Sequence, residues 1–151
     1  MHVSSQFTVG IHSLMVVAFF EDDRITSAMV ARSIGCNPVI VRNVFSKLSR
    51  AGLLNPGRGN SRTELAKPAS EITLRDIFLA TEEVQDGSIF HIYPANLKCP
   101  VGSEIHEILD SRFDSAMQAM LDDMSRTTLA DLVSELPPEK KVLPEELKTM
   151  R

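Results

Sequence analysis

Cysteine is scarce in this chain of 151 residues, and long apolar runs are absent from it. The two cysteines, Cys36 and Cys99, are too few and too far apart in sequence to form a disulfide framework. The longest apolar run covers residues 14–20, well short of the roughly 20 residues that span a bilayer. The first residues also lack the basic, apolar and small-residue order of a secretion signal. We therefore expect a cytoplasmic protein with no membrane partner.

Patterns typical of catalysis are missing as well. The sequence holds no Ser/His/Asp-like grouping, no glycine-rich phosphate loop and no cluster of residues at metal-ligand spacing. Glu82 and Glu83 are adjacent, so they cannot share one face of a helix. We therefore predict that the chain is not an enzyme and that it holds no cofactor and no metal.

Charge is distributed unevenly along the chain. Residues 1–80 carry nine Lys/Arg and six Asp/Glu, a net charge of +3, whereas residues 81–151 carry seven and fourteen, a net charge of −7. Between Arg42 and Lys67 there are six basic residues and a single acid, Glu64. A polyanion such as DNA would meet this stretch first.

Apolar spacing and capping residues predict a mainly α-helical fold. Residues 4–20 show helical periodicity, and a second helix is expected from residue 26 or 27 to residue 34. Gly35 ends this helix because glycine tolerates a positive φ. Three further helices are expected at residues 73–82, 103–124 and 128–136.

A third helix begins after Asn37, which suits an N-cap, with Pro38 at the first helical position. Gly52 closes it. Its buried stripe is predicted to hold Val41, Val44, Phe45 and Leu48. Two short strands at 53–55 and 64–67 then flank a basic tip, and Pro68 ends the hairpin.

Two short helices followed by a basic hairpin predict a winged helix-turn-helix, in which the second helix enters the major groove of DNA. Its outward residues should then be polar or small. The wing tip presents Arg58 to a minor groove. The predicted DNA-binding residues are Asn37, Val39, Arg42, Asn43, Ser46, Lys47, Arg50, Arg58 and Arg62.

Within this set, the first residues of the recognition helix are placed for base edges, whereas Lys47 and Arg50 are better placed for phosphate. Basic exposed helix faces are also common in proteins that bind no DNA. A winged-helix protein-interaction module is therefore the alternative, although six cations between residues 42 and 67 favour DNA.

The order of several short motifs is also informative. These are residues 25–35, Asn37-Pro38-Val39, Ala51-Gly52-Leu53, Gly57-Arg58-Gly59, Ala66-Lys67-Pro68, residues 72–77, residues 98–102 and residues 127–132. In this order they resemble the Rrf2 family of bacterial winged-helix transcription regulators, over about residues 2–135. The resemblance implies a homodimer whose long helices cross between subunits, repression of nearby promoters, and contacts to operator DNA from the recognition helix and from Arg58.

Several members of that family hold an iron–sulfur cluster on three closely spaced cysteines. Residues 83–103 contain only Cys99, and such clusters need several thiolates, so a cluster is disfavoured. A labile metal site using His91 and His106 is disfavoured too. Cys99 precedes a helix start and follows Lys98, which suits a redox-responsive thiol. The alternative is that Cys99 fills a small apolar gap.

The helix at 103–124 carries more apolar surface than the winged domain covers, so a dimerisation role is favoured over folding back onto that domain. The expected domains are a winged helix-turn-helix over 1–82, an irregular sensor or linker segment over 83–103, a dimerisation helix and short C-terminal helix over 104–136, and a flexible tail over 137–151. The expected effector is an oxidant or a small molecule.

Overall fold

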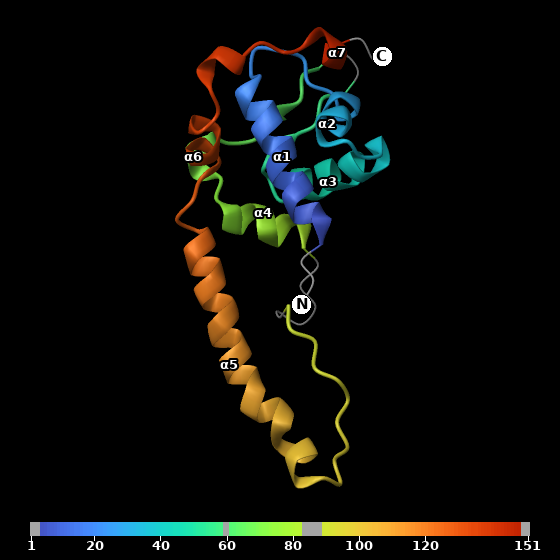
Figure 1. Cartoon of the computed structure of the whole chain (residues 1–151), viewed down its shortest axis with the longest axis vertical. Helices are drawn as coiled ribbons and strands as arrows, with labels where there is room; N and C mark the ends of the chain where they lie inside the picture. Colours follow the sequence, from blue (N-terminus) through green and yellow to red (C-terminus); the bar gives the residue numbers. More distant parts are fainter. Residues whose placement is uncertain (1–3, 59–60, 83–88, 149–151) are drawn as a thin grey trace.

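The computed structural model of the chain describes residues 4–58, 61–82 and 89–148. Its fold is mainly helical, with one antiparallel sheet of two short strands, as the sequence predicts. Figure 1 shows a body of short helices from which α5 (Pro100–Met124) projects as a long arm. No helix in the described part of the chain is long and apolar enough to cross a membrane.

Helix α1 (Ser5–Phe19) lies at the centre of the body and packs against helices from both ends of the chain (Figure 1). It crosses α4 (Leu74–Thr81) at Gly10. A Cβ atom at this glycine would lie 2.9 Å from the Thr81 methyl group, so only glycine allows the two helices to approach so closely. The rings of Phe7 and Phe78 meet edge to face beside this crossing, 5.3 Å apart.

The predicted helix-turn-helix is confirmed in its elements and its caps. Helix α2 (Ser27–Ile34) ends at Gly35, whose φ is 80°. Helix α3 (Pro38–Arg50) begins at Asn37, whose Oδ1 accepts a hydrogen bond from the N–H of Val39 at 2.9 Å. All four residues of the predicted apolar stripe of α3 are buried: Val41, Val44, Phe45 and Leu48.

The hairpin after α3 consists of β1 (Leu54–Asn55) and β2 (Glu64–Leu65), paired in antiparallel register. A further hydrogen bond from the N–H of Ala66 to the carbonyl of Leu53 extends the ladder by one step. The strands are therefore at the predicted places and slightly shorter. Two residues of the tip, 59 and 60, lie outside the described residues.

The chain then passes through a 3₁₀ turn, η1 (Ala69–Glu71), into α4, and it returns to the body from α5 through α6 (Leu129–Ser134). Both α4 and α6 begin with a capping box, made by Thr73 and Thr128. These two threonines also pair with each other in an isolated antiparallel bridge. The two helix starts therefore hold each other in place at the base of the arm.

The predicted start of the long helix differs in the structure. Helix α5 begins at Pro100 rather than at residue 103, with Cys99 as its N-cap. Proline suits the first position of a helix, because the missing N–H has no partner there in any case. Residues 89–99 form no regular element, as expected, and residues 83–88 of the proposed sensor segment lie outside the described residues.

The segment after α6 was expected to be a flexible tail, but through residue 148 it is folded against the body. It contains η3 (Pro138–Lys140) and α7 (Glu145–Lys148), and Leu143 is buried in the core. Lys141 pairs with Glu21 at 2.9 Å, and Arg32 donates to the carbonyl of Glu146 at 2.6 Å. Apolar burial and these polar contacts hold residues 137–148 across α1 and α2, and we call this segment the strap. Residues 149–151 lie outside the described residues.

Candidate nucleic-acid interface

The exposed face of α3 is opposite its buried stripe. Val39 is 48% exposed, Ile40 is 40% exposed, and the predicted contacts Asn37, Arg42, Asn43, Ser46 and Arg50 are exposed as well. Because four buried positions fix the rotation of the helix about its axis, these side chains share one surface. Asn37 has a structural role there, since its side chain caps the helix.

A groove of about 580 Å³ runs between the start of α2, the middle of α3 and the wing. Four arginines line it, although they come from three separate parts of the sequence: Arg24, Arg42, Arg50 and Arg58. Four residues with hydroxyl groups also line the groove: Thr26, Ser27, Ser46 and Ser49. Guanidinium and hydroxyl groups in this arrangement suit the phosphates of a nucleic-acid backbone.

The wing presents Arg58 through a tight turn. The N–H of Ser61 donates to the carbonyl of Arg58 at 3.0 Å, and the Ser61 hydroxyl donates to the same carbonyl at 2.7 Å. A Cβ atom at Gly57 would collide with the carbonyl oxygen of Ser61, so glycine is required for this closure. Arg58 is exposed at this turn.

Two of the predicted DNA contacts point elsewhere within the chain. Lys47 is half-buried, and its Nζ donates to the carbonyl of Thr81 at the end of α4, at 3.3 Å. Arg62 donates to the carbonyl of Glu21, just beyond α1, at 3.0 Å. The structure therefore brings Arg42, Ser46, Arg50 and Arg58 to the groove, and it brings neither Lys47 nor Arg62 there.

Arg24 also lines this groove, although it is outside the predicted DNA-binding set. It lies two residues before the N-cap Thr26 of α2. Its position could have been a signal, because N–H groups at the start of a helix attract anions and a nearby arginine adds to that attraction. The exposed Ile40 was also missed, since it belongs to neither the buried stripe nor the basic set.

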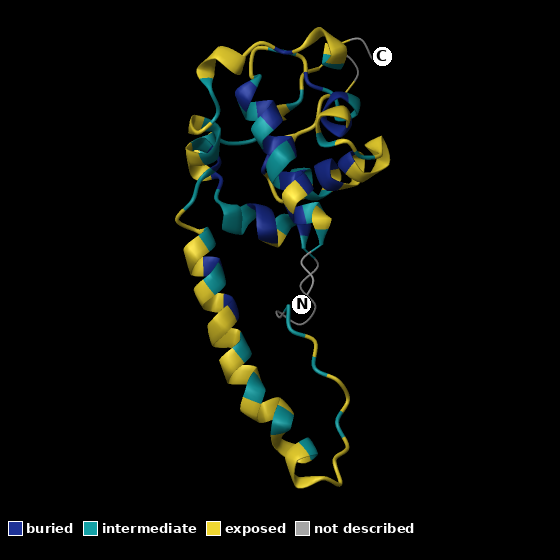
Figure 2. Cartoon of the chain, in the orientation of Figure 1, coloured by how far each residue is buried: buried dark blue, intermediate teal, exposed yellow. Residues whose placement is uncertain are grey.

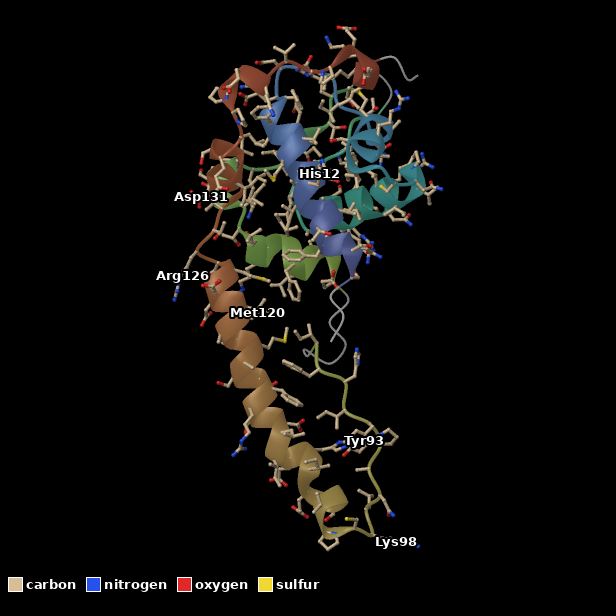
Figure 3. The ribbon with its side chains drawn as sticks, viewed as in Figure 1. His12, Tyr93, Lys98, Met120, Arg126 and Asp131 are labelled. Carbon is tan, nitrogen blue, oxygen red and sulfur yellow. The ribbon has the colours of Figure 1, made fainter. Side chains whose placement is uncertain are left out.

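Cys99 lies at the far end of the arm, near the labelled Lys98 in Figure 3. The backbone N–H groups of Gly102 and Val101 at the start of α5 hold the pKa of its thiol below the usual value. The side chain is exposed, so it does not fill an apolar gap within the chain. A Cβ atom at Gly102 would collide with the carbonyl oxygen of Asn96, so this glycine allows the turn before Cys99 to fold onto the helix.

Comparison with known proteins agrees with this geometry. The profile of the Rrf2 family, described as an iron-dependent transcriptional regulator, matches residues 3–135. The chain belongs to the Rrf2 family. It is 31% identical over 134 residues to YwnA of Bacillus subtilis, which is named as an HTH-type transcriptional regulator; the match covers 89% of this chain and 98% of YwnA.

Solved structures show the same fold. A crystal structure described as a DNA-binding protein is 28% identical, with a TM-score of 0.66 over 85% of this chain and 98% of that one. A transcriptional regulator from Lactobacillus plantarum is 24% identical, with a TM-score of 0.70 over 97% of this chain and 99% of that one. This Rrf2 protein is therefore a transcription regulator with a winged-helix DNA-binding fold, and it is not an enzyme. The alternative of a pure protein-interaction module is set aside.

The iron named in the family description does not fit the residues of this Rrf2 protein. Cys36 lies between α2 and α3 in the body, whereas Cys99 is at the start of α5, at the opposite end of the molecule (Figure 1). The Nε2 atom of His106 lies 2.9 Å from the carbonyl oxygen of Tyr93, so this ring nitrogen already has a partner within the chain. In residues 4–58, 61–82 and 89–148, no three His, Cys, Asp or Glu side chains are grouped so that they could hold a metal ion.

The contact of Lys47 leads to a prediction about stability. We expect Lys47→Ala to lower the free energy of unfolding by about 0.5–1 kcal/mol, because a positive charge at the end of α4 is lost. Arg58→Ala, on the exposed wing, should change it by less than about 0.5 kcal/mol. Urea unfolding of both variants measures the difference. Equal losses would show that the contact between Lys47 and Thr81 is not a stabilising one.

Proposed function

We propose that this Rrf2 protein represses transcription in the cytoplasm by binding operator DNA as a homodimer. The observation that carries the proposal is the groove in which arginines of the α2 start, α3 and the wing converge. Four cations from three separate parts of the chain line this one hollow. A polyanion that fits along the groove would meet all of them, which supports the proposal.

In this proposal the recognition helix α3 lies in the major groove. Arg42 and Asn43 face base edges, and the apolar Val39 meets the methyl group of thymine. Ser46 and Arg50, further along the helix, bind phosphate oxygens. Arg58 on the slim wing tip enters the adjacent minor groove.

Dimerisation through α5 is supported by the apolar side chains of this helix that remain exposed in the single chain. Figure 2 shows that α5 is exposed along most of its length. The body buries only Met117 and Leu121 near its C-terminal end. Residues 89–99 lie along one side, where the ring of Phe90 stacks on that of Phe113 at 4.5 Å. Val101 and Ile108 remain 66% and 49% exposed, and a second copy of the helix would cover them.

The first test concerns DNA. Binding to the DNA upstream of its own gene should weaken with salt, with a log–log slope of roughly −0.9 per phosphate neutralised. We expect Arg50→Ala to make this slope shallower by about 1.8, because it removes one phosphate-binding cation from each subunit of the dimer. Arg42→Ala should weaken binding mainly through the lost base contacts. A gel shift over a salt series provides the measurement.

The matched control for this test is Arg126→Ala. Arg126 is an exposed arginine at the base of the arm, labelled in Figure 3, outside the groove. Its loss should leave the slope unchanged. If Arg126→Ala weakened binding as much as the groove variants, or if no variant changed the slope, the proposed interface would be wrong.

The second test concerns the dimer. We expect the parent protein to sediment as a dimer and Ile108→Asp to sediment as a monomer, because a buried charge at the interface would be unpaired. Since Ile108 is exposed within one chain, the variant should keep its helical circular dichroism. Glu107→Gln, on the neighbouring exposed position, is the control. A parent that sediments as a monomer, or an unaffected Ile108→Asp, would contradict dimerisation through this face.

A redox response through Cys99 is a further part of the proposal. Its exposed thiol and lowered pKa favour the thiolate, which is the form that peroxide oxidises to a sulfenic acid. We expect hydrogen peroxide to weaken the binding of operator DNA by the parent protein and to leave Cys99→Ser unaffected, with recovery after dithiothreitol. Gel shifts of both proteins, before and after oxidation, measure this. Unchanged binding by the oxidised parent would exclude the thiol and leave a small-molecule effector.

A further inference from the structure

An apolar groove of about 570 Å³ separates the outer face of α1 from the strap, residues 137–148. Its floor is formed by Ile11, Met15 and Phe19, and its outer wall by Pro144 and Leu147. The volume is within the range of about 300–1,000 Å³ that small-molecule sites occupy. The groove lies on α1, where Figure 3 labels His12, and is separate from the arginine-lined groove.

The strap keeps this groove open because it is tied to the body beside it. Leu143, at 4% exposed, is buried in the core. Lys141 pairs with Glu21, and the carbonyl of Glu146 accepts from Arg32 of α2. Prolines at 137, 138 and 144 restrict the backbone between these contacts. A strap fixed in this way cannot collapse onto the apolar floor.

Polar groups of the lining are few and lie at defined places. His12 and Ser33 meet through Nε2 and Oγ at 2.9 Å, so α1 and α2 both reach the groove. Burial lowers the pKa of His12, which keeps its imidazole neutral at pH 7. Lys140 of the strap is then the single charged side chain among the described lining residues, and no carboxylate lines the groove.

We propose that this groove binds a small amphipathic anion, an apolar chain or ring that carries one carboxylate. The apolar body lies between α1 and the strap, and the carboxylate pairs with Lys140. Charge complementarity selects the anion, since the lining residues that the structure describes include one cation and no acid. The apolar floor excludes sugars and nucleotides, whose many polar groups would lose their hydrogen bonds to water there.

This site goes beyond DNA binding, and a regulatory role for it rests on the function proposed above. The ligand would contact α1, α2 and the strap together, and α2 packs directly on the recognition helix α3. A ligand that binds better to one arrangement of α2 than to another shifts the protein toward that arrangement. DNA affinity would change accordingly.

Decanoate, below its critical micelle concentration, is the probe for the test. Isothermal titration of the full chain without DNA should show saturable binding of one decanoate per chain. We expect Lys140→Ala to weaken this binding about fivefold, as the loss of an exposed ion pair allows. Lys148→Ala is the matched control, because Lys148 lies on the same strap, pairs with Glu145 and does not line the groove. Decanol, which has no charge, should bind Lys140→Ala and the parent equally.

A second variant locates the site. Leu147→Glu places a like charge in the wall and should abolish decanoate binding while the protein stays folded and keeps its oligomeric state. The proposal is overturned by an absence of saturable binding, by equal losses in Lys140→Ala and Lys148→Ala, or by unchanged binding in Leu147→Glu. It is also overturned if Leu147→Glu dissociates the dimer, because a second copy would then cover the groove.

The regulatory part is tested separately, by gel shift with and without saturating decanoate. A changed DNA affinity in the parent, absent from Leu147→Glu, is expected. An unchanged affinity in a protein that binds both ligands would overturn this part alone. Because the titration contains no DNA, a failure of DNA binding and a failure of the ligand site are distinguishable.

Discussion

The burial of one face of α3 is the constraint on which the interface depends. Val41, Val44, Phe45 and Leu48 are all buried, and each contributes roughly 1.5–3 kcal/mol for apolar surface removed from water. With 3.6 residues per turn, these positions determine the rotation of the helix, and therefore which side chains face outward. Asn37 and Gly52 determine where the helix begins and where the chain turns into the wing. The charged surface is thus a consequence of the core behind it.

The arm depends on a different constraint, because it leaves the body and the chain must return. A helix of 25 residues extends about 37 Å, too far for the body to cover its apolar face. The return is fixed where Thr73 and Thr128 pair, each also capping its own helix. Leu129 and Ile72, both fully buried, anchor this junction in the core. The arm is therefore fixed at its base and carries exposed apolar side chains along its length. A second copy of the chain could cover these side chains.

Local signals in the sequence predicted the helices, their caps and the buried stripe, because a cap or an apolar period depends on residues a few positions apart. The directions of Lys47 and Arg62 could not be predicted in this way. Their partners, the carbonyls of Thr81 and Glu21, are 34 and 41 residues away in the sequence. A basic residue that serves another helix end and one that faces DNA look alike in a sequence. The strap was missed for the same reason, since Leu143 stands among prolines and charges and its burial depends on packing at the opposite end of the chain.

Glu21 links the wing to the strap. Its carbonyl accepts from Arg62 of the wing, while its carboxylate pairs with Lys141 of the strap. Arg32 makes a second link, from α2 to the carbonyl of Glu146. The close-packed core resists small displacements, so the polar contacts of Glu21 and Arg32 are the links through which the strap, the wing and α2 can influence one another. A displacement of the strap would therefore reach the wing and α2 through these side chains, while the buried stripe of α3 keeps its packing. The wing and α2 would then shift relative to α3, while α3 itself keeps its structure.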